Sequence, residues 1–202
     1  MAVGLNNTIL SLQKEDHMAQ PIIDAEVLTK WYLEEELTDD EIASRLNVDR
    51  TAIVHARRKL NLQSRNKMIA ERNLEFVLEH LEGRFNVIKV GSNDLIINEK
   101  KVKVFISTFI ESGHSKFRLT EKPESGLVEN EDYVLLKNGW YRPIWKNKVD
   151  IILFVQISIL KKMNFWMFYA EELDELGIQN LSLKATGGLK YSLFMDRWNI
   201  LE

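Results

Sequence analysis

Two helix starts separated by one tight connection lie within a short stretch of this sequence, and this spacing restricts the fold more than any other feature. Thr38-Asp-Asp-Glu41 matches a capping box, in which the threonine hydroxyl accepts from a first-turn amide and the glutamate reaches back to the threonine amide. Asn47-Val48 supplies the connection, and Asp49 is suited to cap a further helix that ends near Leu60. The pattern predicts two short helices joined by a turn.

A third amphipathic stretch precedes this pair. Apolar residues recur at three- and four-residue spacings from Ala25 and predict a helix that ends near Leu37. Asn61 is a plausible left-handed cap for the last helix of the three. The residues of the two later helices and their turn that we expect to face a shared core are Ile42, Ala43, Leu46, Val48, Ile53 and Leu60.

Charge is divided sharply within this region. The whole chain has a net charge of −3, which is unlike the basic balance of most nucleic-acid-binding domains. Residues 24–41, however, contain eight acids and one base, whereas residues 50–67 contain six bases and no acid. The acidic first helix therefore hides a basic third helix in the total.

The sequence of residues 40–62 resembles the helix-turn-helix modules of bacterial regulators, recombinases and DNA endonucleases. Ala43 stands where that motif needs a small residue for close approach of the helices, and Val48 fills the apolar position of its turn. The resemblance implies that the third helix enters a major groove of double-stranded DNA. A helical hairpin that contacts only proteins is the alternative.

The resemblance divides the polar residues of the third helix into two groups. Residues of its first turns are expected to face base edges, and its far end and the following loop are expected to reach phosphates. The expected base contacts are Arg50, Thr51, Val54 and His55, and the expected phosphate contacts are Arg58, Lys59 and Arg65. A solvated basic helix end, which stabilises its own dipole, is the alternative for the second group.

Composition excludes several other classes. The chain has no cysteine, which excludes disulfide frameworks, thiolate metal sites and cysteine nucleophiles. Its longest apolar run is too short to span a bilayer, and its first twenty residues lack the pattern of a secretory signal. We therefore expect a cytoplasmic protein without a membrane partner, with a flexible tail over residues 1–20 and the helix-turn-helix domain over residues 21–65.

The remaining residues, 66–202, read as a mixture of helices and strands. An amphipathic helix is expected over 70–81, strands over 85–90, 94–97 and 102–106, and a polar hairpin turn over 98–101. The apolar run 149–157 suits a buried central strand with 165–169 as its neighbour, and a helix begins at Glu171 and stops at Gly177. This order predicts an α+β fold in which helices flank a mixed β-sheet.

The order of these elements resembles the restriction-endonuclease-like, or PD-(D/E)xK, nuclease fold. The resemblance is carried by Gly91-Ser-Asn-Asp-Leu-Ile-Ile97, by Val102-Lys-Val-Phe-Ile-Ser107 and by the later apolar strands. The family's chemistry requires one acid at a strand start, then an acid two residues before a lysine on the next strand, which together bind Mg²⁺ and position water. Asp94 holds the first position, but Lys103 and Phe105 stand at the other two. The site therefore looks degenerate.

One alternative keeps the site active. Glu99-Lys-Lys101 spells the acid-x-lysine triplet, and a shifted register would bring Glu99 and Lys101 close to Asp94, with Glu71 or Glu75 as a further carboxylate. The metal ligands would then be Asp94, Glu99 and Glu75, and the catalytic residues Asp94, Glu99 and Lys101. A turn-capping aspartate and a solvated hairpin tip are the plain interpretations of the same residues.

An aromatic segment, Trp140-Tyr-Arg-Pro-Ile-Trp-Lys146, interleaves cations with rings. Such rings pack in a core or interface more often than they stack on bases, and both interpretations stay open. For the whole chain we expect a sequence-specific double-stranded DNA-binding protein, a regulator that works as a homodimer without a cofactor or small-molecule substrate. A Mg²⁺-dependent DNA endonuclease of restriction or homing type is the alternative, and a protein-interaction module is a third.

Overall fold

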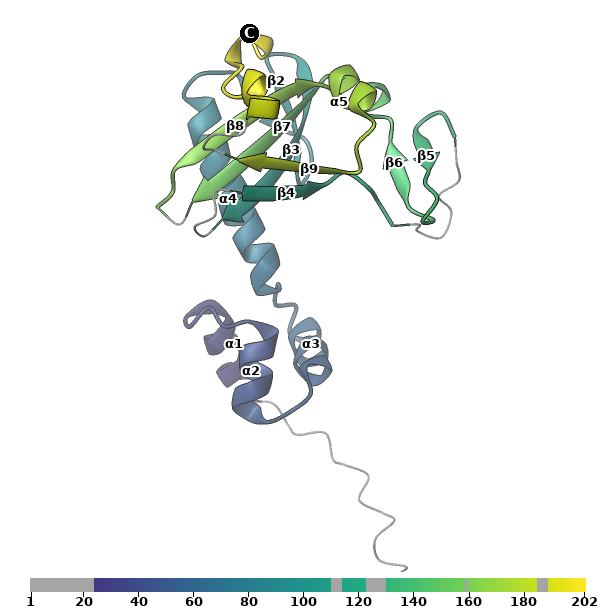
Figure 1. Ribbon diagram of the computed structural model, residues 1–202. Coiled ribbons are helices and arrows are strands. Elements are labelled where there is room, and N and C mark those ends of the chain that lie inside the picture. Colours follow the sequence, from purple (N-terminus) through teal and green to yellow (C-terminus); the bar gives the residue numbers. More distant parts are fainter. Residues whose placement is uncertain (1–23, 110–113, 123–129, 159, 185–188) are drawn as a thin grey trace, which may run out of the picture. The chain divides into compact units, whose positions relative to one another are not determined.

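The computed structural model describes residues 24–109, 114–122, 130–158, 160–184 and 189–202 of the 202-residue chain (Figure 1). Across these residues the fold is α+β, as expected, with five α-helices and a mixed β-sheet. The chain divides into two compact units, Met1–Ile69 and Ala70–Glu202. The tail expected over residues 1–20 lies outside the described residues.

The first unit consists of three short helices around one small core. They are α1 (Ala25–Leu33), α2 (Asp39–Leu46) and α3 (Arg50–Lys59). Five buried side chains form their shared core, with Val48 and Leu62 packed against its edge: Leu28, Tyr32, Ile42, Ala43 and Ile53.

Local hydrogen bonds at the helix ends follow the sequence signals closely. Thr38 and Glu41 form both hydrogen bonds of the capping box at the start of α2. Asn47 then adopts a left-handed conformation with a φ of 51° and turns the chain toward Asp49, whose side chain caps α3. Asn61 is also left-handed, with a φ of 54°. These caps satisfy amides that a short helix leaves without partners.

Three details of the first unit differ from the sequence expectation. Leu46 and Leu60, which were expected to face the core, are 36% and 37% exposed, and Leu62 packs against the core instead. Helix α1 ends at Leu33 rather than near Leu37. Acidic residues follow that end, and negative charge is unfavourable at a helix C-terminus because the helix dipole is negative there.

The second unit is built on a five-stranded sheet with the strand order β1-β2-β3-β7-β8 (Figure 1). Strands β3 and β7 pair in parallel, and the other neighbours pair antiparallel. The strands are β1 (Val87–Lys89), β2 (Asp94–Ile97), β3 (Lys100–Phe109), β7 (Ile151–Ser158) and β8 (Met163–Tyr169).

Both faces of this sheet are covered. Helix α4 (Arg65–Glu82) packs on one face through Val77 and Leu81. The C-terminal Ile200 and Leu201 belong to the same core. The other face is covered by the two-stranded ribbon of β4 (His114–Arg118) and β9 (Asn180–Lys184), together with α5 (Ala170–Leu176) and the short turn η1 (Trp145–Asn147).

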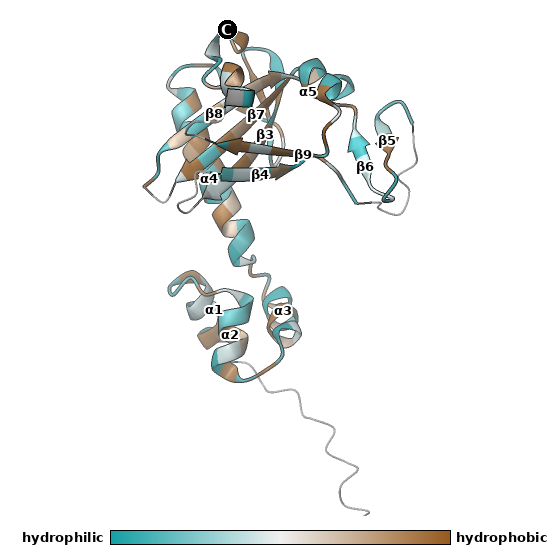
Figure 2. Cartoon of the chain, in the orientation of Figure 1, coloured by the Kyte–Doolittle hydropathy of each residue, from teal (hydrophilic) through white to brown (hydrophobic). Residues whose placement is uncertain are grey.

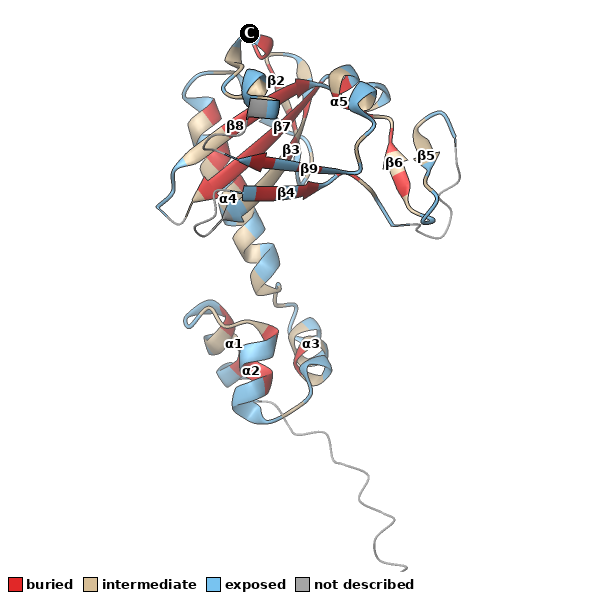
Figure 3. Ribbon diagram, viewed as in Figure 1, coloured by how far each residue is buried: buried red, intermediate tan, exposed pale blue. Residues whose placement is uncertain are grey.

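Strand β7 shows the consequence of this double cover. Its residues 151–157 are all buried (Figure 3), and the strand is hydrophobic over most of its length (Figure 2). In β3, by contrast, the two faces differ: Val102 and Val104 face the α4 side, whereas Phe105 belongs to the core on the ribbon side. This alternation decides which residues of β3 reach the candidate nuclease-type site.

Several elements of this unit differ from the sequence expectation. Helix α4 begins at Arg65 rather than residue 70, because the Ser64 hydroxyl accepts from the Lys67 amide at 3.4 Å and caps an extra turn. Strand β9 was not expected, nor was the small antiparallel pair β5 (Tyr133–Leu135) and β6 (Tyr141–Pro143).

Candidate nucleic-acid interface

Helix α3 has two unlike faces. Ile53 on its inner face is fully buried in the core of the first unit. Residues three or four positions apart share a side of a helix, which places the polar and basic residues of α3 together on the outer side. Val54 is half-buried, and the other residues of α3 expected to contact DNA are exposed: Arg50, Thr51, His55, Arg58 and Lys59. The fold therefore presents these side chains on one accessible face.

Asp49 fixes the start of this face. Its Oδ1 accepts from the Thr51 amide at 2.7 Å. Hydrogen bonds from the Thr51 hydroxyl and the Thr51 amide hold the pKa of the Asp49 carboxyl below its ordinary value. The Thr51 side chain is exposed at this first turn.

Arg50 has an ionic partner that the sequence analysis did not single out. Its Nε lies 3.3 Å from Oδ1 of Asp40, and the two side chains are 60% and 74% exposed. An ion pair this exposed contributes little to stability because water and salt screen it. Arg50 can therefore leave Asp40 for another anionic or acceptor group at small cost.

Arg57 differs from its basic neighbours on α3. Its guanidinium donates to Oδ1 of Asp39 at 3.1 Å and to the carbonyl oxygen of Leu62 at 3.0 Å. The Arg57 and Asp39 side chains are 12% and 9% exposed, and the Tyr32 hydroxyl also donates to Asp39. This network ties α3 to the start of α2 and to α1, so Arg57 serves the fold of the unit.

Arg65, expected to contact a phosphate, also makes an intramolecular pair. Its guanidinium contacts the carboxylate of Glu36, and its side chain is 14% exposed. Glu36 lies in the turn after α1 with a φ of 54°, so the pair joins that turn to the start of α4. Arg58 and Lys59 thus present their cations to solvent, whereas the Arg65 cation is largely enclosed.

The nuclease-type position centres on Asp94 in the second unit. Asp94 and Lys103 are direct partners in the β2–β3 register, and the Lys103 ammonium lies 2.9 Å from Oδ1 and 3.0 Å from Oδ2 of Asp94. A Cβ atom on Gly91 would lie 2.8 Å from Asp94 Oδ2, so glycine is needed there to leave room for the carboxylate. Phe105 lies against Phe154, with ring centroids 5.3 Å apart.

Glu99 does not approach Asp94. Asn98 and Glu99 form the two-residue turn between β2 and β3, with φ angles of 48° and 69°. The register puts this turn at the far end of β2 from Asp94, roughly 10 Å along the strand. The side-chain amide of Asn98 donates to the Leu201 carbonyl oxygen at 3.1 Å, which holds the turn against the C-terminal residues.

Lys101 and Glu75 are the remaining residues that the endonuclease alternative requires. Lys101 is exposed at the start of β3, and its amide donates to Asp150 Oδ2 at 2.7 Å. Glu75 is exposed on α4, the helix that covers the opposite face of the sheet from Phe105. In the described part of the chain, no three acidic or histidine side chains lie close enough to hold a metal ion. The expected grouping of Asp94, Glu99 and Glu75 around Mg²⁺ is therefore not formed.

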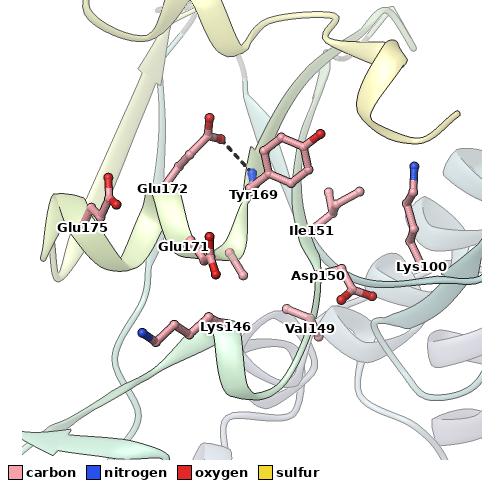
Figure 4. Close-up of a pocket in the computed structure, with 10 residues that line it drawn as sticks. Lys100, Lys146, Val149, Asp150, Ile151, Tyr169, Glu171, Glu172 and Glu175 are labelled. Atoms are coloured by element: carbon pink, nitrogen blue, oxygen red, sulfur yellow. Dashed lines mark hydrogen bonds between the residues drawn. The ribbon is translucent and has the colours of Figure 1, made fainter.

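A depression of about 450 Å³ lies beside the start of α5 (Figure 4). Its carboxylates are partly engaged in the fold: Glu172 accepts from the Tyr169 amide at 2.8 Å and pairs with Arg197, and Asp150 accepts from the Lys101 amide. The residues that line it contain no serine, threonine or histidine to act as nucleophile or base. The pocket is a polar depression with four carboxylates among its lining residues.

Comparison of the chain with models of protein families, with curated proteins and with solved structures finds no match. Among the described residues, no helix combines the length and apolar character needed to cross a membrane. Any function proposed for this chain therefore rests on its own sequence and geometry.

Proposed function

We propose that this protein binds double-stranded DNA sequence-specifically, with α3 as the element that enters the major groove. The observation that carries the proposal is the outer face of α3, on which exposed polar and basic side chains stand opposite the buried Ile53. A major groove admits one α-helix, and a helix held from behind by a core presents the opposite side to the groove.

The residues of this face take two roles. Arg50 at the first turn forks onto a guanine after it leaves Asp40, and Val54 contacts a thymine methyl group. Thr51 accepts from a base amino group, and His55 lies one turn further along the same side. Arg58 and Lys59, at the end of α3, neutralise phosphates and set the salt dependence of binding rather than its sequence preference.

The second unit, in this proposal, is a restriction-endonuclease-like domain without catalysis. Its support is the meander β1–β3 followed by a strand parallel to β3, and the occupation of the Asp94 carboxylate by Lys103. Such a chain acts as a regulator that recognises its site without cleaving it. A homodimer on a symmetric site fits the usual mode of groove-reading helices.

Selection from a random duplex library tests the proposal. We expect a preferred sequence, and we expect Arg50→Ala to weaken binding by about 10- to 100-fold, with relaxed preference at one base pair. Lys30→Ala, which removes one exposed cation from α1, is the matched control and keeps the preference. If no duplex is preferred and Arg50→Ala changes nothing, the proposal is wrong.

A further inference from the structure

The two-stranded ribbon of β4 and β9 has one face in the core and one in solvent. The strands pair antiparallel, with Lys116 opposite Ser182 and Arg118 opposite Asn180. The inner side chains are at most 5% exposed and pack on the sheet: Ser115, Phe117, Leu181 and Leu183. This packing fixes the orientation of the residues that alternate with them, since side chains of a strand point to opposite faces in turn.

The outer face of this ribbon is basic without any acid. Lys116, Arg118 and Lys184 are exposed on it, with His114, Asn180 and Ser182 between them. None of the ten residues of the two strands is acidic. Lys116, Arg118 and Lys184 form no ion pair with the described residues of the chain, whereas Arg142 and Arg197 in the same unit each pair with a carboxylate.

Trp140 extends this basic face beyond the end of β4. The guanidinium carbon of Arg118 lies 4.8 Å from the centroid of the Trp140 ring, and the ammonium of Lys122 lies 5.9 Å from it. Cation–π contacts of this kind orient a cation without neutralising it. Trp140 therefore keeps the positive charges of Arg118 and Lys122 close to one ring.

The charge of this face indicates the partner. A chain with net charge −3 that gathers three exposed cations on one ribbon face has a surface complementary to a polyanion. We propose that the outer face of the β4–β9 ribbon contacts the phosphate backbone of double-stranded DNA. This sequence-independent contact would be made in addition to the contact of α3. This inference rests on the proposed function.

Salt dependence of binding by the full chain tests the ribbon. The variant carries Lys116→Thr, Arg118→Thr and Lys184→Thr, because threonine suits an exposed strand. We expect the slope of log Kd against log salt concentration to fall by about 2 to 3, since each phosphate contact contributes about 0.9. The loss should be equal for the preferred duplex and a scrambled one. The control, Lys89→Thr with Lys101→Thr and Lys162→Thr, removes the same charge from exposed positions outside the ribbon.

The outcomes separate the two proposals. If the ribbon variant is folded by circular dichroism and keeps the wild-type slope on both duplexes, the ribbon proposal is wrong and α3 alone carries binding. The ribbon proposal is equally wrong if only self-association changes in sedimentation velocity, because the face then contacts a second copy. Failure of the proposed function looks different: Arg50→Ala then leaves sequence preference unchanged, while the ribbon variant still reports on phosphate contact.

Discussion

Lys103 occupies both carboxylate oxygens of Asp94, at 2.9 Å and 3.0 Å. The β2–β3 register makes the two residues direct partners, so their contact is a property of the sheet and not of a chance rotamer. An ammonium group there takes the place that a divalent cation would need beside Asp94. Phe105, two positions further along β3, packs on Phe154, so a lysine and an aromatic ring follow Asp94 where Mg²⁺ binding would need a second carboxylate.

Lys103→Glu should turn this ion pair into a weak divalent-cation site. Two carboxylates would then face each other across β2 and β3, which lowers the free energy of unfolding by about 1 kcal/mol or more without metal. Thermal unfolding with and without 5–10 mM Mg²⁺ or Mn²⁺, added at roughly constant ionic strength, measures the effect. We expect the Tm of the variant to fall and to recover with either cation, while the Tm of the wild type does not respond.

Lys101→Glu is the control for this change, because it adds the same charge at an exposed position. Its Tm should not depend on divalent cations. Plasmid cleavage by the wild type with Mg²⁺ or Mn²⁺, abolished by Asp94→Ala, would contradict our interpretation of the site and favour an endonuclease.

Asp39→Ala should destabilise the first unit strongly. The substitution leaves the Arg57 guanidinium largely buried without its carboxylate and removes the acceptor of the Tyr32 hydroxyl. Loss of one partner of a buried pair costs about 3–5 kcal/mol, which is a large part of the stability of a unit this small. Helical circular dichroism during thermal unfolding should show an early transition for this unit.

Glu35→Gln provides the comparison for that prediction. It removes an exposed ion pair with Arg45, whose side chains are 37% and 48% exposed, and should cost less than about 1 kcal/mol. Similar losses for the two variants would mean that the Asp39 network does not hold the three helices together.

The local signals of this sequence predicted local structure well. Asp94–Ile97 has the expected bounds, and Thr38, Asp49 and Asn61 act at helix ends as expected. The helix caps depend on neighbours within four residues, which the sequence displays directly. Strand β9 also has a sequence signal for a strand, because Asn180-Leu-Ser-Leu-Lys184 alternates polar and apolar residues.

The sequence does not show which charged residues pair with one another. Arg57 and Arg58 are adjacent and identical in type, yet one is enclosed with Asp39 and the other is exposed. They differ because the folded unit places Arg57 beside Asp39, which lies eighteen residues earlier in the chain. Likewise, the partner of Arg65 is Glu36, and only the folded chain brings that turn to the start of α4. The sequence shows which residues are cationic, but only the structure shows which of these side chains are exposed to another molecule.

Mild acid should destabilise the second unit through His80. Burial, assisted by the charge of Arg84, holds the pKa of His80 below its ordinary value near 6.5, and Asp196 opposes this shift. His80 stacks on Phe165 with ring centroids 5.0 Å apart. Because the unfolded chain takes up the proton first, the free energy of unfolding should fall as the pH drops below about 6.5 and level off below the folded pKa.

Urea unfolding between pH 7.5 and 5 measures this effect of His80. His80→Gln should flatten the pH dependence in that range. A wild-type stability that rises as the pH falls through this range would have the opposite sign and contradict the assignment.

Asp40→Asn should tighten DNA binding. Asp40 lies 3.3 Å from Arg50 and competes with DNA for its guanidinium, and its own charge repels phosphates near α3. An exposed pair of this kind is worth about 0.2–1 kcal/mol, so we expect the Kd at low salt to fall by up to about fivefold. Fluorescence anisotropy with the preferred duplex measures the change. In an Arg50→Ala background the gain should shrink, because the competition is gone, and Glu34→Gln, directly after α1, should give no comparable gain. Equal gains with and without Arg50 would show that Asp40 acts by general repulsion and that Arg50 does not contact DNA.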